Sequence, residues 1–114
     1  MPERAETENE MALRIMDAAI DLVRGMRGTI DSVAQHDADL ARQLRRALTS
    51  IPLNIAEGER RWNGHGRQRF ETAMGSANEV AACLRVADAL GHVALDAALL
   101  DGLDKIARTL RRLS

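Results

Sequence analysis

The segment from Ser50 to Gly58, with the sequence SIPLNIAEG, constrains the fold of this 114-residue chain more than any other part of it. Apolar residues recur there at the three- and four-residue steps of a helix, yet position 52 is a proline. A proline inside a helix removes one backbone donor, clashes with the carbonyl group four residues earlier and costs about 3 kcal/mol. A second unusual segment, residues 73–79 with the sequence AMGSANE, lies in the next helical pattern. We therefore predict that the two segments face each other on adjacent helices and that polar contacts between them compensate for the proline.

Length and composition limit the chain to one compact domain. A domain of this size buries about two-thirds of the surface of its unfolded chain. The apolar residues, 46% of the sequence, are largely Ala, Leu, Ile and Val, and only 2% of the residues are aromatic. Such a core suits closely packed helices, whereas a β-sandwich would need aromatic and β-branched residues in alternation.

The hydrophobic pattern predicts four helices, with residues 1–6 frayed and residues 7–114 forming a single domain. Thr7 to Glu10 matches a capping box at the start of the first helix, and Gly25 and Gly28 weaken this helix without ending it. Asp37 is the expected N-cap of the second helix. The predicted ranges are about 7–33, 37–61, 66–90 and 94–113. Because the connections are short, we expect an all-α, antiparallel, up-down-up-down four-helix bundle.

The third predicted helix has apolar residues on two nearly opposite sides. One side carries Phe70 and Val80 and would face the core of the bundle. In a chain of this size a single core covers only one side of a helix, so the other side predicts a subunit interface. The residues of this second side are Gly75, Ala82, Cys83, Val86 and Leu90.

No residue set in the sequence has the spacing of a metal or catalytic site, and we expect no enzyme activity and no cofactor. His36, His65 and His92 each fall in a predicted connection, with His36 and His92 at one end of the bundle and His65 at the other. Glu57 and Glu79 would support acid-base chemistry only if they were buried side by side. We favour a structural role for the polar residues of the two facing segments, as hydrogen-bonding groups that join the second and third helices and fix their register. These residues are Asn54, Glu57, Arg61, Ser76 and Glu79.

Basic residues are the remaining functional candidates. The net charge is −1, so the chain as a whole does not attract nucleic acid, but residues 42–69 hold seven arginines against two glutamates. Guanidinium groups bind phosphates, and an aromatic ring among them can stack on a base, although a run of charges is more often a solvated face. The candidates for nucleic-acid binding are Arg42, Arg45, Arg46, Arg60, Arg61, Trp62, Arg67 and Arg69.

The expected location is the cytoplasm. The single cysteine excludes an internal disulfide framework and fits a reducing compartment. No apolar run is long enough to cross a bilayer, and the N-terminus is acidic where a signal peptide would be basic, so no membrane partner is expected.

The two facing segments, together with Arg61 and Phe70, resemble a known bacterial family. These are the four-helix-bundle proteins encoded in intervening sequences of large-subunit ribosomal RNA genes, a group that includes the accessory proteins of diversity-generating retroelements. The resemblance covers the whole chain in length and helix order, and its specific part is residues 47–79. It marks Ser50, Pro52, Asn54, Glu57, Gly58, Arg61, Gly75, Ser76 and Glu79 as family positions.

The resemblance implies an antiparallel four-helix bundle, assembly as a ring-like homopentamer and no enzymatic activity. In the retroelement branch it also implies binding of nucleic acid and a reverse transcriptase through a basic surface. This chain differs from that branch in its slightly acidic balance and its single lysine.

Two functions of different classes follow. The first is a non-enzymatic oligomeric scaffold or adaptor that contacts RNA or a ribonucleoprotein through the arginines around the connection of the second and third helices. The second is a structural module that binds a protein partner and has no nucleic-acid role.

Overall fold

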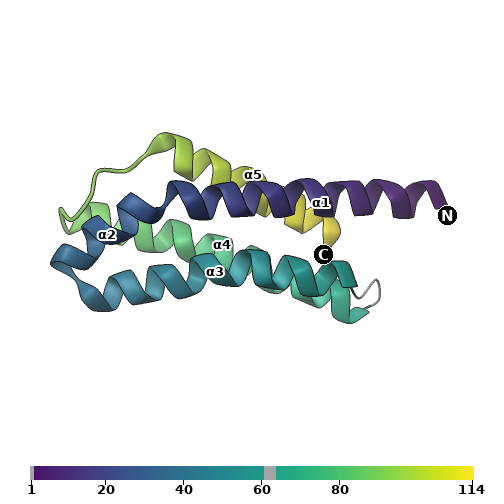
Figure 1. The fold of residues 1–114 in the computed structure, drawn as a ribbon, viewed down its shortest axis with the longest axis horizontal. Coiled ribbons are helices and arrows are strands. Elements are labelled where there is room, and N and C mark those ends of the chain that lie inside the picture. Colours follow the sequence, from purple (N-terminus) through teal and green to yellow (C-terminus); the bar gives the residue numbers. More distant parts are fainter. Residues whose placement is uncertain (1, 61–63) are drawn as a thin grey trace.

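The computed structural model describes residues 2–60 and 64–114, and side chains are described for residues 8–60 and 66–114. All regular structure in these ranges is helical, which confirms the predicted all-α class. The prediction of four helices is not confirmed, because five are found (Figure 1). They are α1 (Pro2–Gly25), α2 (Arg27–His36), α3 (Ala38–Arg60), α4 (Gly64–Ala89) and α5 (Ala97–Leu113).

The fifth helix arises from a break at Met26 within the first predicted helix. Met26 has a ψ angle of −6°, and its amide is shared between the carbonyl groups of Leu22, at 3.0 Å, and Val23, at 3.3 Å. This tighter turn separates α1 from α2 between the two glycines, Gly25 and Gly28. The expectation that the glycines would weaken the helix without ending it was therefore wrong.

The first helix also starts earlier than predicted. The backbone of α1 is already helical at Pro2, so the capping-box pattern at Thr7 lies inside the helix and does not begin it. Proline is well suited to a first helical turn, since its missing N–H group would have no partner there. Fraying of residues 1–6 stays a prediction.

The helices lie along the long axis of an elongated molecule of 50 × 23 × 19 Å, and α1, α3, α4 and α5 alternate in direction (Figure 1). α3 packs on α1, α2 and α4, while α5 packs on α1 and α4. The core between them holds the predicted inward faces of α3 and α4. Its largest fully buried side chains are Phe70, Met26, Leu44, Leu48, Ile51, Ile55, Leu110, Val33 and Val80.

α3 remains one continuous helix through Pro52. Its start confirms a prediction: the Asp37 carboxylate accepts a hydrogen bond of 3.0 Å from the amide of Leu40, as an N-cap residue does. Because Asp37 also ends α2, the turn between the two helices consists of that one residue.

The connection between α4 and α5 begins with a glycine that ends α4 and finishes with an N-cap residue that begins α5. Gly91 has a φ angle of +79°, and the amide of His92 donates to the carbonyl of Ala87 at 2.8 Å, which confirms the predicted glycine end of this helix. Asp96 then caps α5 by accepting from the amide of Ala98 at 2.9 Å. The predicted start near residue 94 was therefore too early, and Leu95, expected to face inward, lies in the connection with 42% of its surface exposed.

Among the helices of the described ranges, none combines the length and apolar composition that a bilayer crossing requires.

Candidate functional site

The two unusual segments meet, as predicted, through a small cluster of polar side chains between α3 and α4. The hydroxyl group of Ser76 lies 2.8 Å from the Ser50 hydroxyl oxygen and 3.1 Å from the Thr72 carbonyl oxygen. Because it has one proton, it donates to one of them at a time. The amide of Asn54 donates to both the hydroxyl and the carbonyl oxygen of Ser50, each at 2.9 Å. Ser50 thus joins its own helix to α4.

The predicted compensation for the proline is not found in this cluster, because none of its side chains donates to the carbonyl that Pro52 leaves without a partner. Pro52 removes the amide donor that would normally serve the carbonyl of Leu48, four residues earlier. The Asn54 side chain donates instead to the carbonyl of Ser50. Both hydrogen bonds of Asn54 lie within α3, so it orients the Ser50 hydroxyl that meets Ser76 and does not replace the donor lost at Pro52.

Gly58 brings the two helices into direct contact at their connected end. A Cβ atom added to Gly58 would lie 2.6 Å from Cε1 of Phe70 and 2.8 Å from two other atoms of the same ring. Such separations are far below van der Waals contact, and only 1% of the Phe70 surface is exposed, so the ring has no free space to move into. The glycine at this position is required because the aromatic ring of α4 packs directly on the α3 backbone.

The other family positions do not converge on this contact. Glu57 is half-buried, Glu79 is exposed, and only Glu79 lines the groove beside the serine pair. Gly75 is exposed on α4, and nothing lies within 4 Å of the place where its Cβ would be. Arg61 lies outside the described residues. The two glutamates therefore do not form a shared acid-base site. No contact within the chain requires a glycine at position 75.

A polar groove between α3 and α4 continues from the serine pair. Besides Ser50 and Ser76, it is lined by Arg42 and Arg46 and by the acidic residues Asp39 and Glu79. Arg42 forms an ion pair with Asp39. Because the two arginines are matched by two carboxylates, the groove has no net positive charge that would by itself hold a phosphate.

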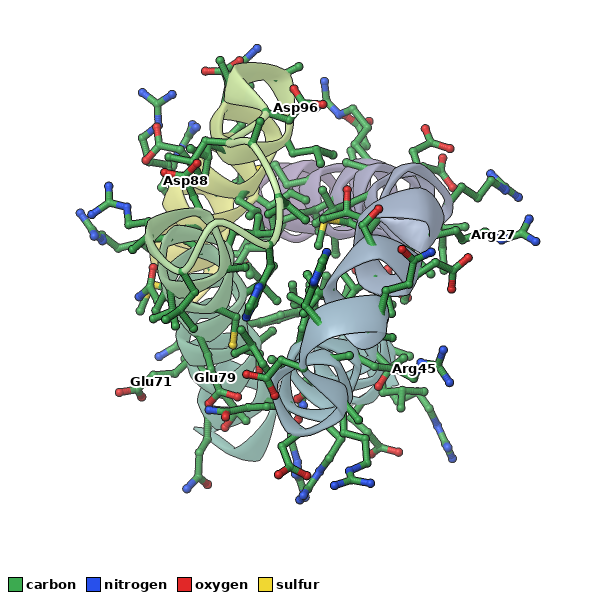
Figure 2. All side chains as sticks on the ribbon, turned by 90° about the vertical axis from the view of Figure 1, so that its left-hand side faces the viewer. Arg27, Arg45, Glu71, Glu79, Asp88 and Asp96 are labelled. Carbon is green, nitrogen blue, oxygen red and sulfur yellow. The ribbon has the colours of Figure 1, made fainter. Side chains whose placement is uncertain are left out.

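The predicted arginines that lie among the described residues are exposed but do not form one patch. Arg42, Arg45 and Arg46 lie in the first turns of α3, whereas Arg60 ends that helix. Since each helical residue advances 1.5 Å, Arg42 and Arg60 are separated by about 27 Å along α3. Figure 2 shows Arg45 on the side of the molecule that carries Arg27, away from α4.

A second basic group gathers at the connected end of α3 and α4. Arg60, Arg67 and Arg69 flank the connection, and all three are exposed. None of the three has an ion pair within the described part of the chain. Arg61 and Trp62, also predicted for nucleic-acid binding, lie outside it.

The second apolar side of α4 is exposed in the single chain, with one correction. Val86 and Leu90 have 47% and 57% of their surfaces exposed, and Ala82 is also exposed. Cys83, assigned to the same face, is buried in the chain's own core. Burial and, to a lesser extent, the nearby Glu79 carboxylate raise the pKa of its thiol, so the group stays neutral and packs as a small apolar side chain.

Two of the three histidines lie at one end of the molecule, as predicted, although His36 is the last residue of α2 and not part of a connection. The rings of His36 and His92 are stacked 5.1 Å apart with an angle of 2° between their planes. The Nε2 atom of His92 lies 4.0 Å from the Asp37 carboxylate. The side chain of His65 lies outside the described set. Within the described residues, no three His, Cys, Asp or Glu side chains group as metal ligands would.

Sequence reasoning missed Glu59, a carboxylate of α3 that faces α1. One of its oxygens is buried and has no hydrogen-bond partner among the described residues. Burial and then the Asp17 carboxylate raise the pKa of Glu59 above its ordinary value. The sequence held a signal, because residue 59 lies four positions after the buried Ile55 and so continues the inward stripe of α3.

We expect Glu59→Gln to increase the free energy of unfolding at pH 7, by less than about 1 kcal/mol for a partly exposed group. A raised pKa in the folded state means that the charged form destabilises the fold at neutral pH. This penalty disappears as the pH falls through the folded-state pKa. Urea unfolding at pH 7 and pH 3.5, at one protein concentration, should show a gain at the higher pH that is largely lost at the lower, where the carboxyl is protonated in both the folded and the unfolded state. An equal gain at both pH values would contradict the ionisation argument.

Comparison with known families agrees with the sequence resemblance. The family model described as 23S rRNA-intervening sequence protein matches residues 11–112, which include both unusual segments and all five helices in whole or in part. Neither the curated proteins nor the solved structures contain a significant match. The chain belongs to the family of 23S rRNA-intervening sequence proteins.

Proposed function

We propose that this chain is a non-enzymatic, oligomeric helical scaffold or adaptor of the cytoplasm that contacts RNA or a ribonucleoprotein through arginines. The observation that carries the proposal is the family match, because the family is named for its connection with intervening sequences of 23S ribosomal RNA. The exposed arginines supply suitable chemistry, since guanidinium groups form paired hydrogen bonds with phosphate oxygens.

The scaffold is an antiparallel four-helix bundle in which α1 and α2 together form one interrupted rod. Support comes from the break between them, which consists of Met26 alone and keeps its hydrogen bond to Leu22. Both halves contribute buried residues to the same core, Ile15 from α1 and Val33 from α2. In this description the rods run up, down, up and down.

The assembly is a homo-oligomer, and the resemblance implies a pentamer. The exposed side of α4 supports this part of the proposal, because Val86 and Leu90 present apolar surface that the chain itself does not cover. A single exposed leucine is ordinary, but apolar residues in line on one helix are typical of an interaction surface.

RNA contact is assigned to the group formed by Arg60, Arg67 and Arg69. Two features favour this group over the arginines at the start of α3. Arg42 is already paired with Asp39, and the groove beside Arg42 and Arg46 carries a second carboxylate. At the connected end, no acidic side chain of the described residues pairs with the three guanidinium groups.

A non-enzymatic role is supported by the positions of the two carboxylates that were the best catalytic candidates. An acid-base pair needs both groups in one pocket. Glu79 lines the groove between α3 and α4, and Glu57 does not.

Replacing Arg60, Arg67 and Arg69 together with Ala should weaken retention of a fluorescent single-stranded RNA at low salt. The slope of log affinity against log salt is negative, and each lost phosphate contact makes it about 0.7 less steep. Losing three contacts should therefore reduce the steepness by about 2. The matched control replaces Arg24, Arg27 and Arg108, which removes the same charge elsewhere. Binding titrations over a range of salt concentrations measure both. Equal slopes for the two variants would contradict the assignment.

If the wild type shows no salt-dependent RNA binding, the second function is favoured, in which the chain is a structural module that binds a protein partner. The net charge of −1 and the ion pair at Arg42 are the features that favour it. A pull-down would then recover the same protein partner with and without nuclease treatment.

A further inference from the structure

We propose that a groove between α1 and α5 receives the exposed face of α4 from a second copy of this chain. The proposal rests on the oligomeric part of the proposed function and names the two surfaces that meet. It follows from the shape and charge of the groove, from those of α4, and from the directions in which the helices run.

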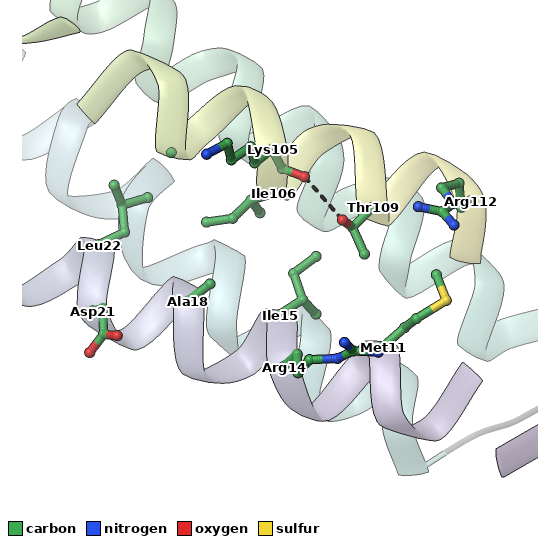
Figure 3. Close-up of a pocket in the computed structure, with 11 residues that line it drawn as sticks. Met11, Arg14, Ile15, Ala18, Asp21, Leu22, Lys105, Ile106, Thr109 and Arg112 are labelled. Atoms are coloured by element: carbon green, nitrogen blue, oxygen red, sulfur yellow. Dashed lines mark hydrogen bonds between the residues drawn. The ribbon is translucent and has the colours of Figure 1, made fainter. Parts of the chain in front are cut away.

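The groove is a hollow with a volume of about 770 Å³ (Figure 3). Its floor is apolar and is formed by Ile15 and Leu22 of α1 and by Ile106 of α5. Ala18 and Gly102 leave room above this floor, because they have little or no side chain. The groove is therefore wide enough for the side chains of another helix.

Positive charges surround the groove. Arg14 of α1 and Lys105 and Arg112 of α5 line it, and Lys105 is paired with Asp101 at 3.2 Å. Arg14 and Arg112 have no acidic partner among the described residues. Asp21, the acidic lining residue, is paired with Arg24 at 3.0 Å and so adds little negative charge. An occupant with an apolar centre and acidic flanks would match this surface.

The exposed face of α4 has those properties. Gly75 and Ala82 lie along it, and nothing in the chain approaches the Cβ position of Gly75. A mid-helix glycine costs about 1 kcal/mol relative to alanine, and here no contact within the chain requires it. Glu71 and Glu79 flank the small residues, are exposed, and have no ion pair within the described residues.

The charges also match in spacing. Glu71 and Glu79 are eight residues apart, or about 12 Å along α4. Arg112 and Lys105 are seven residues apart, or about 10 Å along α5, with Arg14 across the groove. Glu71 can therefore face Arg14 and Arg112 while Glu79 faces Lys105.

The helix directions place these charges at the correct ends. α4 begins at the end of the molecule where α1 begins and α5 finishes (Figure 1). If the copies are related by rotation about an axis parallel to the long axis of the molecule, each helix keeps its direction in every copy. The first turns of α4 in one copy then meet the first turns of α1 and the last turns of α5 in the next copy. Glu71 lies in the early part of α4, and Arg14 and Arg112 lie at this same end.

The two surfaces lie on different sides of one molecule. Figure 2 shows Glu71 and Glu79 projecting from α4 on the side away from α1. A contact between unlike surfaces is heterologous, and it repeats around a ring when the rotation closes.

Charge reversal on each surface tests the pairing with purified, nuclease-treated full-length protein. The groove variant is Arg14→Glu/Lys105→Glu/Arg112→Glu, and the α4 variant is Glu71→Arg/Glu79→Arg. Each should lose self-association, with at least about a 100-fold increase in the dissociation constant at low salt, because like charges then face each other. Mixed in equal amounts, the two variants should associate again above the monomer mass, since each reversed surface finds a complementary one on the other variant. Because the two variants must alternate, the mixture is not expected to close a ring of five.

The readouts are sedimentation equilibrium for mass and circular dichroism for helix content. The control Arg27→Glu/Arg45→Glu/Arg60→Glu reverses three charges on α2 and α3 and should sediment like the wild type. A groove variant that assembles normally, or a mixture of folded variants that stays monomeric, would overturn the pairing while leaving the oligomer in place. A wild type that is itself monomeric would overturn the oligomeric function as well.

Discussion

Gly58→Ala should lower the free energy of unfolding by about 2 kcal/mol. The added methyl group would overlap the Phe70 ring, with its nearest ring atom 2.6 Å away. Overpacking of this kind costs up to about 3 kcal/mol, from which about 1 kcal/mol is regained because alanine favours the helix. The ring is almost fully buried, so the two helices must separate locally to relieve the contact. Urea unfolding followed by circular dichroism measures the loss.

The contact between Gly58 and Phe70 can be isolated with a double-mutant cycle. Phe70→Leu replaces the aromatic ring with a smaller branched side chain, so it should cost clearly less in the Gly58→Ala background than in the wild type. Gly28→Ala serves as the control, since nothing lies within 4 Å of its Cβ position and it should stabilise the protein by about 0.5–1 kcal/mol. Additive effects of Gly58→Ala and Phe70→Leu would show that the ring is not what the glycine accommodates.

Val86→Arg should break the oligomer and leave the chain folded. Val86 is 47% exposed in the single chain, so an arginine can extend into water without disturbing the core. At an interface the same side chain would place an unpaired charge against apolar surface, which costs enough to weaken association by at least about 100-fold. Sedimentation equilibrium should then report a monomer, and the circular dichroism spectrum should keep its helical form.

Leu53→Arg is the matched control for this change. Leu53 is 66% exposed on the outward side of α3, outside both the α4 face and the groove between α1 and α5. Its replacement should leave the mass unchanged. If Val86→Arg and Leu53→Arg both sediment like the wild type, the exposed face of α4 is not an interface.

The pairing of the two unusual segments could be predicted from sequence because local rules conflict there. Pro52, Asn54 and Gly58 all disfavour a helix, and only tertiary contacts explain their presence in a strongly periodic stretch. The capping residue Asp37 and the glycine end at Gly91 were predictable for a related reason, since each acts through its own backbone neighbours.

Other features depend on geometry that one-dimensional patterns do not carry. The break at Met26 follows from a local ψ angle, and a periodic apolar pattern continues across it. Cys83 lies between the two sides of α4, so its burial depends on how the neighbouring helices α3 and α5 pack on α4. The two arginine groups looked like one because they are close in sequence, whereas they lie near opposite ends of α3, a helix of 23 residues. The groove between α1 and α5 joins the two ends of the sequence and has no local signal at all.

The account depends on the claim that contacts between α3 and α4 leave the outer face of α4 available to another copy. The molecular mass of the nuclease-treated wild type, measured by sedimentation equilibrium over a range of concentrations, tests this claim most directly. The account predicts a mass that is a multiple of the 12.5 kDa protomer and that falls to one protomer in Val86→Arg. A wild type that sediments as a single 12.5 kDa species at every concentration would contradict it.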